Sequence, residues 1–140
     1  MINKKVLIGS VVGGIAYFLL GWVIYGILMK DYCATNFNQI GMRPEAEMVL
    51  WAMGLANIAF AMLMALIFSW SNISSLLSGA KIGGIVGFLT AVSIDFSFYA
   101  MTTMFNNWSA LFVDIIVSTL MSAIVGGIII WAMNLGKKTE

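Results

Sequence analysis

Four long apolar stretches, separated by short polar segments, limit what this chain can fold into more than any other feature. They cover about residues 6–29, 48–70, 82–104 and 109–133. A helix crosses the roughly 30 Å hydrocarbon layer of a bilayer with about 20 residues, and each stretch is at least that long. We therefore predict an all-α integral membrane protein, a four-helix bundle in which residues 1–140 form a single transmembrane domain.

The composition excludes most other classes of protein. Of the 140 residues, 61% are hydrophobic and 9% are charged, whereas a soluble domain has about 45–50% apolar and about 25% charged residues. The chain has no histidine and one cysteine, Cys33, so an intrachain disulfide is impossible and the residues for metal sites and general bases are few. We predict no enzyme activity, no cofactor and no metal site. Seven basic against six acidic residues offer no surface to nucleic acid.

The distribution of basic residues predicts the orientation in the membrane. Five of them lie on one side of the predicted bundle: Lys4, Lys5, Lys81, Lys137 and Lys138. The other side has only Lys30 and Arg43. Because cytoplasmic loops carry the excess of Lys and Arg, we expect both termini in the cytoplasm, in a multi-pass protein of the bacterial inner membrane. The first apolar stretch is longer than the 7–15 residues of a signal-peptide core, so we count it as a span.

The connections between the apolar stretches differ in length. Residues 30–47 form the one sizeable loop, on the outer side, and within it 43–47 (Arg-Pro-Glu-Ala-Glu) resembles a helix start, with acids in the first turn. We therefore expect the second helix to begin there. Residues 71–80 are predicted to be a polar cytoplasmic link. Residues 105–108 are predicted to be a tight outer turn, which makes the last two spans antiparallel neighbours.

Glycine-rich patterns recur in the first and third apolar stretches. The pattern GGIxxFL occupies residues 13–19 and again 83–89, an offset of 70. The match fits either an internal duplication of parallel spans or the general frequency of glycine in membrane helices. In both cases small residues predict the surfaces at which the helices approach each other closely.

Two aspartates lie within the apolar stretches and are not explained by helix packing. An Asp at the centre of a membrane helix costs about 2.5–3.5 kcal/mol on insertion scales. With a rise of about 1.5 Å per residue, Asp95 is roughly 13 Å deep and Asp114 roughly 7–8 Å deep from the outer side. No Lys or Arg lies in any of the four stretches to neutralise them. The carboxyls are therefore protonated and hydrogen-bonded, ionised and hydrated, or bound to a cation.

Other polar residues fall in the same layers of the predicted bundle. Folding the last two spans about their turn brings Tyr99 level with Asp114 and Ser118 level with Asp95. Polar residues in the outer halves of the first two spans reach the same depths. The predicted ion- or substrate-binding site therefore comprises Asp95, Asp114, Tyr99, Asn57, Tyr25 and Ser118.

Three functions are compatible with such a cluster. An intramembrane acid suggests a functional site by default, and we expect proton- or cation-linked transport of a small solute. The alternative is a buried hydrogen-bond network that holds helices together. The third alternative is an accessory membrane subunit that binds lipid, pigment or a partner protein, for which the 11 methionines and nine phenylalanines offer adaptable apolar surface. The expected partners are the bilayer and either a second copy of the chain or another membrane protein.

The run from Leu20 to Leu28 (LGWVIYGIL) ends the first stretch, and the third has a Gly-rich start. Asn106 or Asn107 follows the third stretch, and the fourth carries Asp114, Gly126 and Trp131. In these features the chain resembles a family of short bacterial four-span integral membrane proteins, a domain of unknown function. The resemblance implies the same four-span plan and a role for Tyr25 and Asp114. It implies no particular activity.

Overall fold

The computed structural model describes residues 2–137, and the regular elements among them are all helical. They are α1 (Lys4–Gly21), a π-helical continuation of α1 (Trp22–Leu28), α2 (Lys30–Asn36), a 3-10 turn (Glu45–Glu47), α3 (Leu50–Trp70), α4 (Leu76–Met101) and α5 (Trp108–Lys137). Four are long and apolar enough to cross a membrane, counting α1 with its continuation. The all-α class and the four apolar helices are thus confirmed. Lys138 lies outside the described residues.

The predicted polar link at residues 71–80 is too long, because α4 begins at Leu76. The Ser75 side chain caps the new helix by accepting a hydrogen bond from the Ser78 amide at 3.1 Å. A serine at this position satisfies one of the free amides of the first turn. The apolar pair that follows Ser75 therefore belongs to the helix, and residues 71–75 form the whole connection.

A compact motif ends α3 before this connection. Asn72 adopts a left-handed backbone conformation, with φ of 53°, which asparagine tolerates better than most residues. The amide of Ile73 then donates to the carbonyl of Phe68 at 3.0 Å, as in a Schellman motif. The chain reverses within a few residues and returns toward the start of α4.

The prediction that a helix begins within residues 43–47 is wrong. Only a single 3-10 turn forms at Glu45–Glu47, and Met48 behind it is extended, with ψ of 134°. Helix α3 begins at Leu50. The turn before α5 is also longer than predicted and spans residues 102–107.

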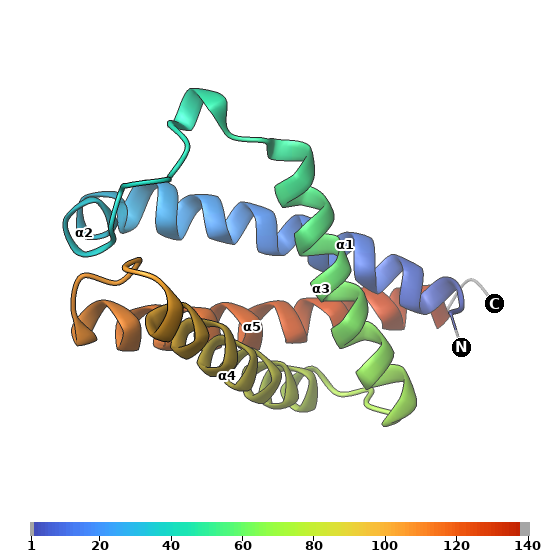
Figure 1. Cartoon of the computed structure of the whole chain (residues 1–140). Coiled ribbons are helices and arrows are strands. Elements are labelled where there is room, and N and C mark those ends of the chain that lie inside the picture. The colour runs from blue at the N-terminus through green and yellow to red at the C-terminus, as the bar shows by residue number, and fades with distance from the viewer. Residues whose placement is uncertain (1, 138–140) are drawn as a thin grey trace.

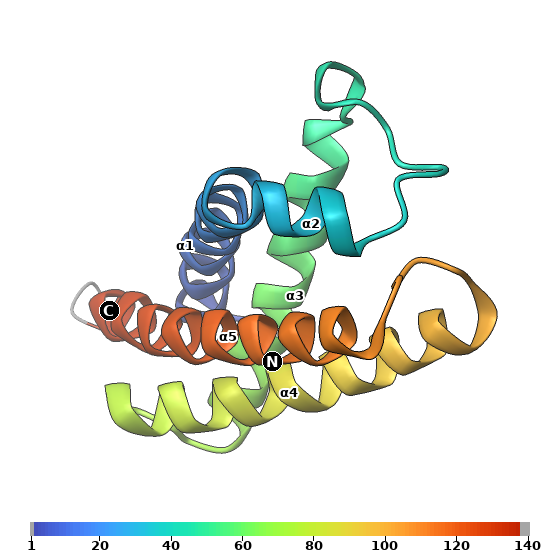
Figure 2. The ribbon, with the colours of Figure 1, turned by 90° about the vertical axis from the view of Figure 1, so that its left-hand side faces the viewer.

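Helix α5 lies between α1 and α4 and runs antiparallel to both (Figure 1). The start of α1 and the end of α5 therefore lie at the same end of the molecule. Helix α3 does not run alongside them but crosses α1 and α5 steeply (Figure 1), and Figure 2 shows the same steep crossing of α3 with α5. Its second half, from Ala61 to Phe68, supplies buried side chains to the core, whereas Leu50, Trp51 and Leu55 in its first half are exposed.

Glycines set the closest contacts between the helices. A Cβ added at Gly83 of α4 would lie 2.6 Å from the carbonyl oxygen of Ser122 on α5 and 2.9 Å from the Cα of Gly126. A Cβ at Gly14 would lie 2.7 Å from the Cα of Ile58, where α1 crosses α3. Since these contacts are with backbone atoms, no side-chain rotation can relieve them. Both copies of the GGIxxFL pattern thus lie at helix contacts, as expected for small residues in apolar helices.

Candidate functional site

The two aspartates lie opposite each other between α4 and α5. Asp95 is 6% exposed, and its Oδ2 atom has no hydrogen-bond partner within residues 2–137. The Asp114 carboxyl, on the facing helix, is near enough to interact with Asp95 both electrostatically and by hydrogen bonding. Two carboxyls side by side repel each other when both are ionised. A proton or a cation between them removes this repulsion.

Tyr25 holds the second carboxyl in place. Its hydroxyl donates a hydrogen bond to Oδ1 of Asp114 at 2.7 Å. Tyr25 lies in the π-helical continuation of α1, where the Met29 amide bonds the carbonyl of Ile24, five residues back, at 2.7 Å. In a regular α-helix, residue 24 would follow Tyr17 after two turns of 3.6 residues. The extra residue of the π-helical segment instead brings Tyr25 to the face that contacts α5.

A second hydrogen bond links α1 to α5 two helical turns further along α5. The hydroxyl of Tyr17 donates to Oγ of Ser122 at 2.8 Å and lies 3.2 Å from the Met64 sulfur. Ser122 is 3% exposed and lies two turns from Asp114 on α5. Ser118 lies between them and interacts with the Tyr25 hydroxyl. A continuous row of polar groups therefore follows α5 into the molecule over about 12 Å, at about 1.5 Å per residue.

We call this row the polar seam. It consists of Asp95, Asp114, Tyr25, Ser118, Tyr17 and Ser122. Four of these residues were predicted for the site, and the structure brings them together. Tyr17 and Ser122 were not predicted. The four-residue spacing of Asp114, Ser118 and Ser122 on one helix face was the available signal.

The structure places Tyr99 and Asn57 outside the polar seam. Tyr99 is 36% exposed, and its ring lies 4.5 Å from the ring of Trp108 at the start of α5. Asn57 donates to the carbonyl of Met53 in its own helix at 2.8 Å. It lies in the half of α3 that the steep crossing holds away from α4 and α5. Sharing a predicted depth with one of the aspartates was therefore not sufficient to bring either residue to the pair.

Helix α2 and the segment after it cover the Asp114 end of the polar seam. The Asn38 amide donates to the carbonyl of Met104 at 2.8 Å, and the Asn106 amide donates to the carbonyl of Asn36 at 3.0 Å. Between these two bonds the rings of Phe37 and Phe105 lie 5.2 Å apart. The loop from α2 is thus fixed to the turn between α4 and α5.

Two side chains of α2 describe the electrostatics of this covering segment, Cys33 and Lys30. Burial raises the pKa of the Cys33 thiol on α2 above its ordinary value, and the Asp114 carboxylate raises it further. Cys33 is therefore an electrostatic neighbour of the polar seam. The Lys30 amine lies 3.5 Å from the Glu45 carboxylate, in an exposed salt bridge. Its charge is therefore paired within the loop and not with the polar seam. Within the described part of the chain, no salt bridge reaches Asp95 or Asp114.

The polar seam offers few other ligands. Among residues 2–137, no group of three or more His, Cys, Asp or Glu side chains is placed to hold a metal ion. The chemistry available is therefore that of two carboxyls with tyrosine and serine hydroxyls. These groups can share and relay protons, or bind one weakly held cation.

No protein-family model, curated protein or solved structure matches the chain. The resemblance to the four-span family therefore stays a prediction. The helices themselves define the class: an all-helical protein with four helices able to span a membrane and, between two of them, a pair of carboxyls of which Asp95 is buried.

Proposed function

We propose that this chain is a multi-pass protein of the bacterial inner membrane with both termini in the cytoplasm. We further propose that it couples the movement of a proton or cation, at Asp95 and Asp114, to the transport of a small solute. One observation carries the proposal. The buried Oδ2 atom of Asp95, which has no hydrogen-bond partner among the described residues, lies beside the Asp114 carboxyl, and no basic side chain in the described part of the chain forms a salt bridge with either aspartate.

The charge balance of the pair favours exchange over a fixed structural role. A buried network that only holds helices together is most stable when every polar group has a partner. Here Tyr25 donates to Asp114, and Oδ2 of Asp95 has no hydrogen-bond partner among the described residues. A proton or cation that binds between the carboxyls supplies that partner and changes the charge of the site when it leaves. Intramembrane acids in pumps and transporters are used in this way.

The surroundings of the pair suggest how access is controlled. The polar seam extends from Asp114 toward Ser122, while α2 lies over its outer end. Exchange with the outer side therefore requires displacement of α2 or of the π-helical end of α1. Four short helices enclose little volume, so the solute pathway is expected to involve a second copy of the chain.

A structural role is the second candidate, because two hydrogen bonds of the polar seam join α1 to α5. Tyr17 bonds Ser122, and Tyr25 bonds Asp114. Interhelical bonds of this kind contribute about 0.6–2 kcal/mol each in membranes. On this alternative the carboxyls keep one protonation state throughout the physiological pH range.

Carboxyl infrared difference titration in nanodiscs separates the two functions. We expect a carboxyl band that changes between about pH 5 and 8 and is lost in Asp95→Asn or Asp114→Asn. Asp31→Asn is the matched control, since Asp31 lies on exposed α2 outside the spans. Carboxyls that stay protonated to about pH 9, with both span variants folded, would contradict transport and favour the structural role.

Proton flux tests the activity directly. In liposomes filled with a pH-sensitive dye and given a pH gradient, the wild-type protein is expected to increase the rate of proton entry. Asp95→Asn should reduce the rate to that of empty liposomes. Ser97→Ala should leave it unchanged, because the Ser97 hydroxyl bonds only the carbonyl of Ser93 in its own helix. Equal rates for wild type and Asp95→Asn would contradict proton coupling.

A further inference from the structure

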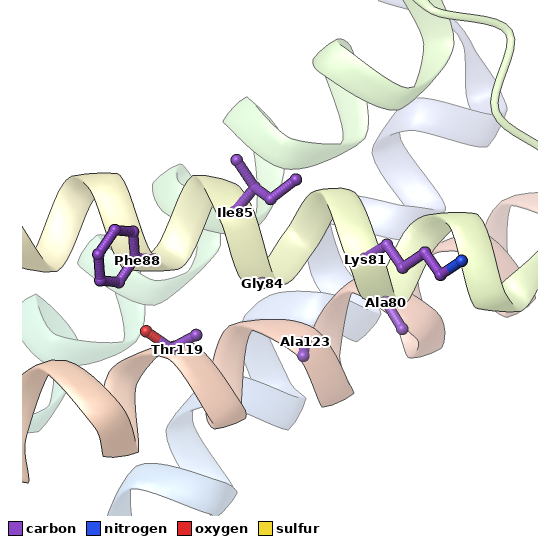
Figure 3. A pocket seen from close by; sticks show the side chains of 7 residues that line it. All are labelled: Ala80, Lys81, Gly84, Ile85, Phe88, Thr119 and Ala123. Carbon is purple, nitrogen blue, oxygen red and sulfur yellow. The ribbon is translucent and has the colours of Figure 1, made fainter.

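A shallow apolar groove of about 490 Å³ lies between α4 and α5, apart from the polar seam (Figure 3). Only these two helices line it. The lining residues are Ala80, Lys81, Gly84, Ile85, Phe88, Thr119 and Ala123. The groove thus has one charged end and an otherwise apolar lining.

Small residues form the floor of the groove. A Cβ added at Gly84 would already lie 3.4 Å from the Cβ of Ala123, so a large side chain at either position would fill the space. Ile85 and Phe88 stand at its edge and are 54% and 45% exposed. The hydroxyl of Thr119 is bonded to the carbonyl of Ile115 at 2.7 Å. The floor therefore presents no free polar group and suits a slender hydrocarbon chain.

Lys81 gives the groove its charge. Its side chain extends toward the N-terminal end of α4, with the amine beyond the groove floor (Figure 3). Lys81 is exposed, and no acidic side chain of the described residues forms a salt bridge with it. A lysine near the end of a membrane helix directs its amine to the headgroup layer. The amine is therefore available to an anionic group at that level.

We propose that this groove binds an anionic phospholipid of the cytoplasmic leaflet, with one acyl chain along Gly84 and Ala123 and the phosphate at Lys81. This assignment rests on the proposed orientation, which puts the start of α4 on the cytoplasmic side. From Lys81 to Phe88 the groove extends about 10 Å along the helix axis. A lipid with its headgroup at the surface and its chain in the bilayer meets the charged end first and the apolar floor below it.

Charge also favours lipid over a second copy of the chain. Small residues on membrane helices are typical of helix dimers, and a two-fold dimer uses the same patch on both subunits. Two copies meeting at this groove would bring their Lys81 side chains together. Like charges at such a contact are unfavourable, whereas an anionic phosphate neutralises the amine.

Native mass spectrometry of the purified protein, with phosphatidylglycerol or phosphatidylcholine added, tests the lipid site. We expect phosphatidylglycerol to bind more tightly, and Lys81→Gln to weaken its binding about five-fold, since one basic residue contributes about 1 kcal/mol to attraction of anionic lipid. Lys4→Gln is the matched control, because Lys4 is exposed on the same side and does not line the groove. It should leave the preference unchanged.

A groove-filling variant tests where the acyl chain lies. Ala123→Leu should weaken the binding of both lipids. If this variant fails to fold, Phe88→Ala, at the exposed edge of the groove, provides a second test. Equal binding of the two lipids by the wild type, or equal effects of Lys81→Gln and Lys4→Gln, would overturn the proposal. Conversion of a wild-type dimer to a monomer by Ala123→Leu would overturn it in favour of a second copy. Proton flux should be unchanged in Lys81→Gln, so failure of the lipid site and failure of the transport function are distinguishable.

Discussion

The geometry of the polar seam depends on one side chain in particular, that of Tyr25. It donates a 2.7 Å hydrogen bond to the Asp114 carboxyl, and it comes from an irregular turn of the helix. π-helical turns are rare in proteins and frequent at functional sites. The irregular turn and the carboxyl pair therefore belong to one arrangement.

Removing this donor should cost stability. Tyr25→Phe keeps the ring and leaves Asp114 without the 2.7 Å bond, so we expect a loss of about 0.6–2 kcal/mol in the free energy of unfolding in mixed micelles. Tyr32→Phe is the control, because the Tyr32 hydroxyl lies in an exposed contact 3.4 Å from Ser109. Equal stabilities of the two variants would show that the Tyr25 bond contributes nothing measurable.

The reactivity of Cys33 should report the charge of Asp114. The thiolate is the reactive form, and burial and the Asp114 carboxylate both raise the pKa of this thiol. Asp114→Asn removes the second cause, so the pKa falls and maleimide labelling at a given pH becomes faster. The measurement is the labelling rate as a function of pH, with Asp31→Asn as control. An unchanged profile in Asp114→Asn would mean that Asp114 carries no charge in the folded protein.

At the scale of the elements, the approach of α4 to α5 depends on glycine. Gly83→Ala puts a Cβ against the backbone of Ser122 and Gly126, and overpacking of this kind costs about 1–3 kcal/mol. Gly54→Ala on α3 is the matched control, since nothing lies within 4 Å of its added Cβ. Unfolding in mixed micelles should therefore separate the two variants. Equal effects would contradict the close α4–α5 contact.

The sequence predicted the existence of these elements better than their arrangement. Length and hydropathy were sufficient to predict four helices, because an apolar run of about 20 residues is typical of a membrane-spanning helix. The steep crossing of α3 was not predictable, since side chains that face lipid and side chains that face protein are equally apolar. Asn57 was assigned to the wrong place for this reason. The π-helical turn at Tyr25 left only a weak signal, its flanking glycines Gly21 and Gly26.

At the scale of the whole molecule, both the transport proposal and the lipid proposal depend on orientation. The antiparallel packing of α1 and α5 leaves the start of one and the end of the other at the same end of the molecule (Figure 1). The loop with Cys33 and the link at residues 71–75 are then at opposite ends of the spans. The excess of basic residues predicts that the loop is outside and the link inside.

Labelling of intact cells with a membrane-impermeant thiol reagent tests this orientation. In a Cys33→Ser background, Met42→Cys in the exposed outer loop should react in intact cells, because Met42 is 49% exposed. Ser74→Cys in the link should react only after the membrane is permeabilised. The reverse pattern would place the termini outside and move Lys81 to the outer leaflet. The groove would then face the headgroups of the outer leaflet, which contradicts the proposed lipid site. The carboxyl pair between α4 and α5 could still exchange a proton or cation, but access to it would be from the opposite side of the membrane.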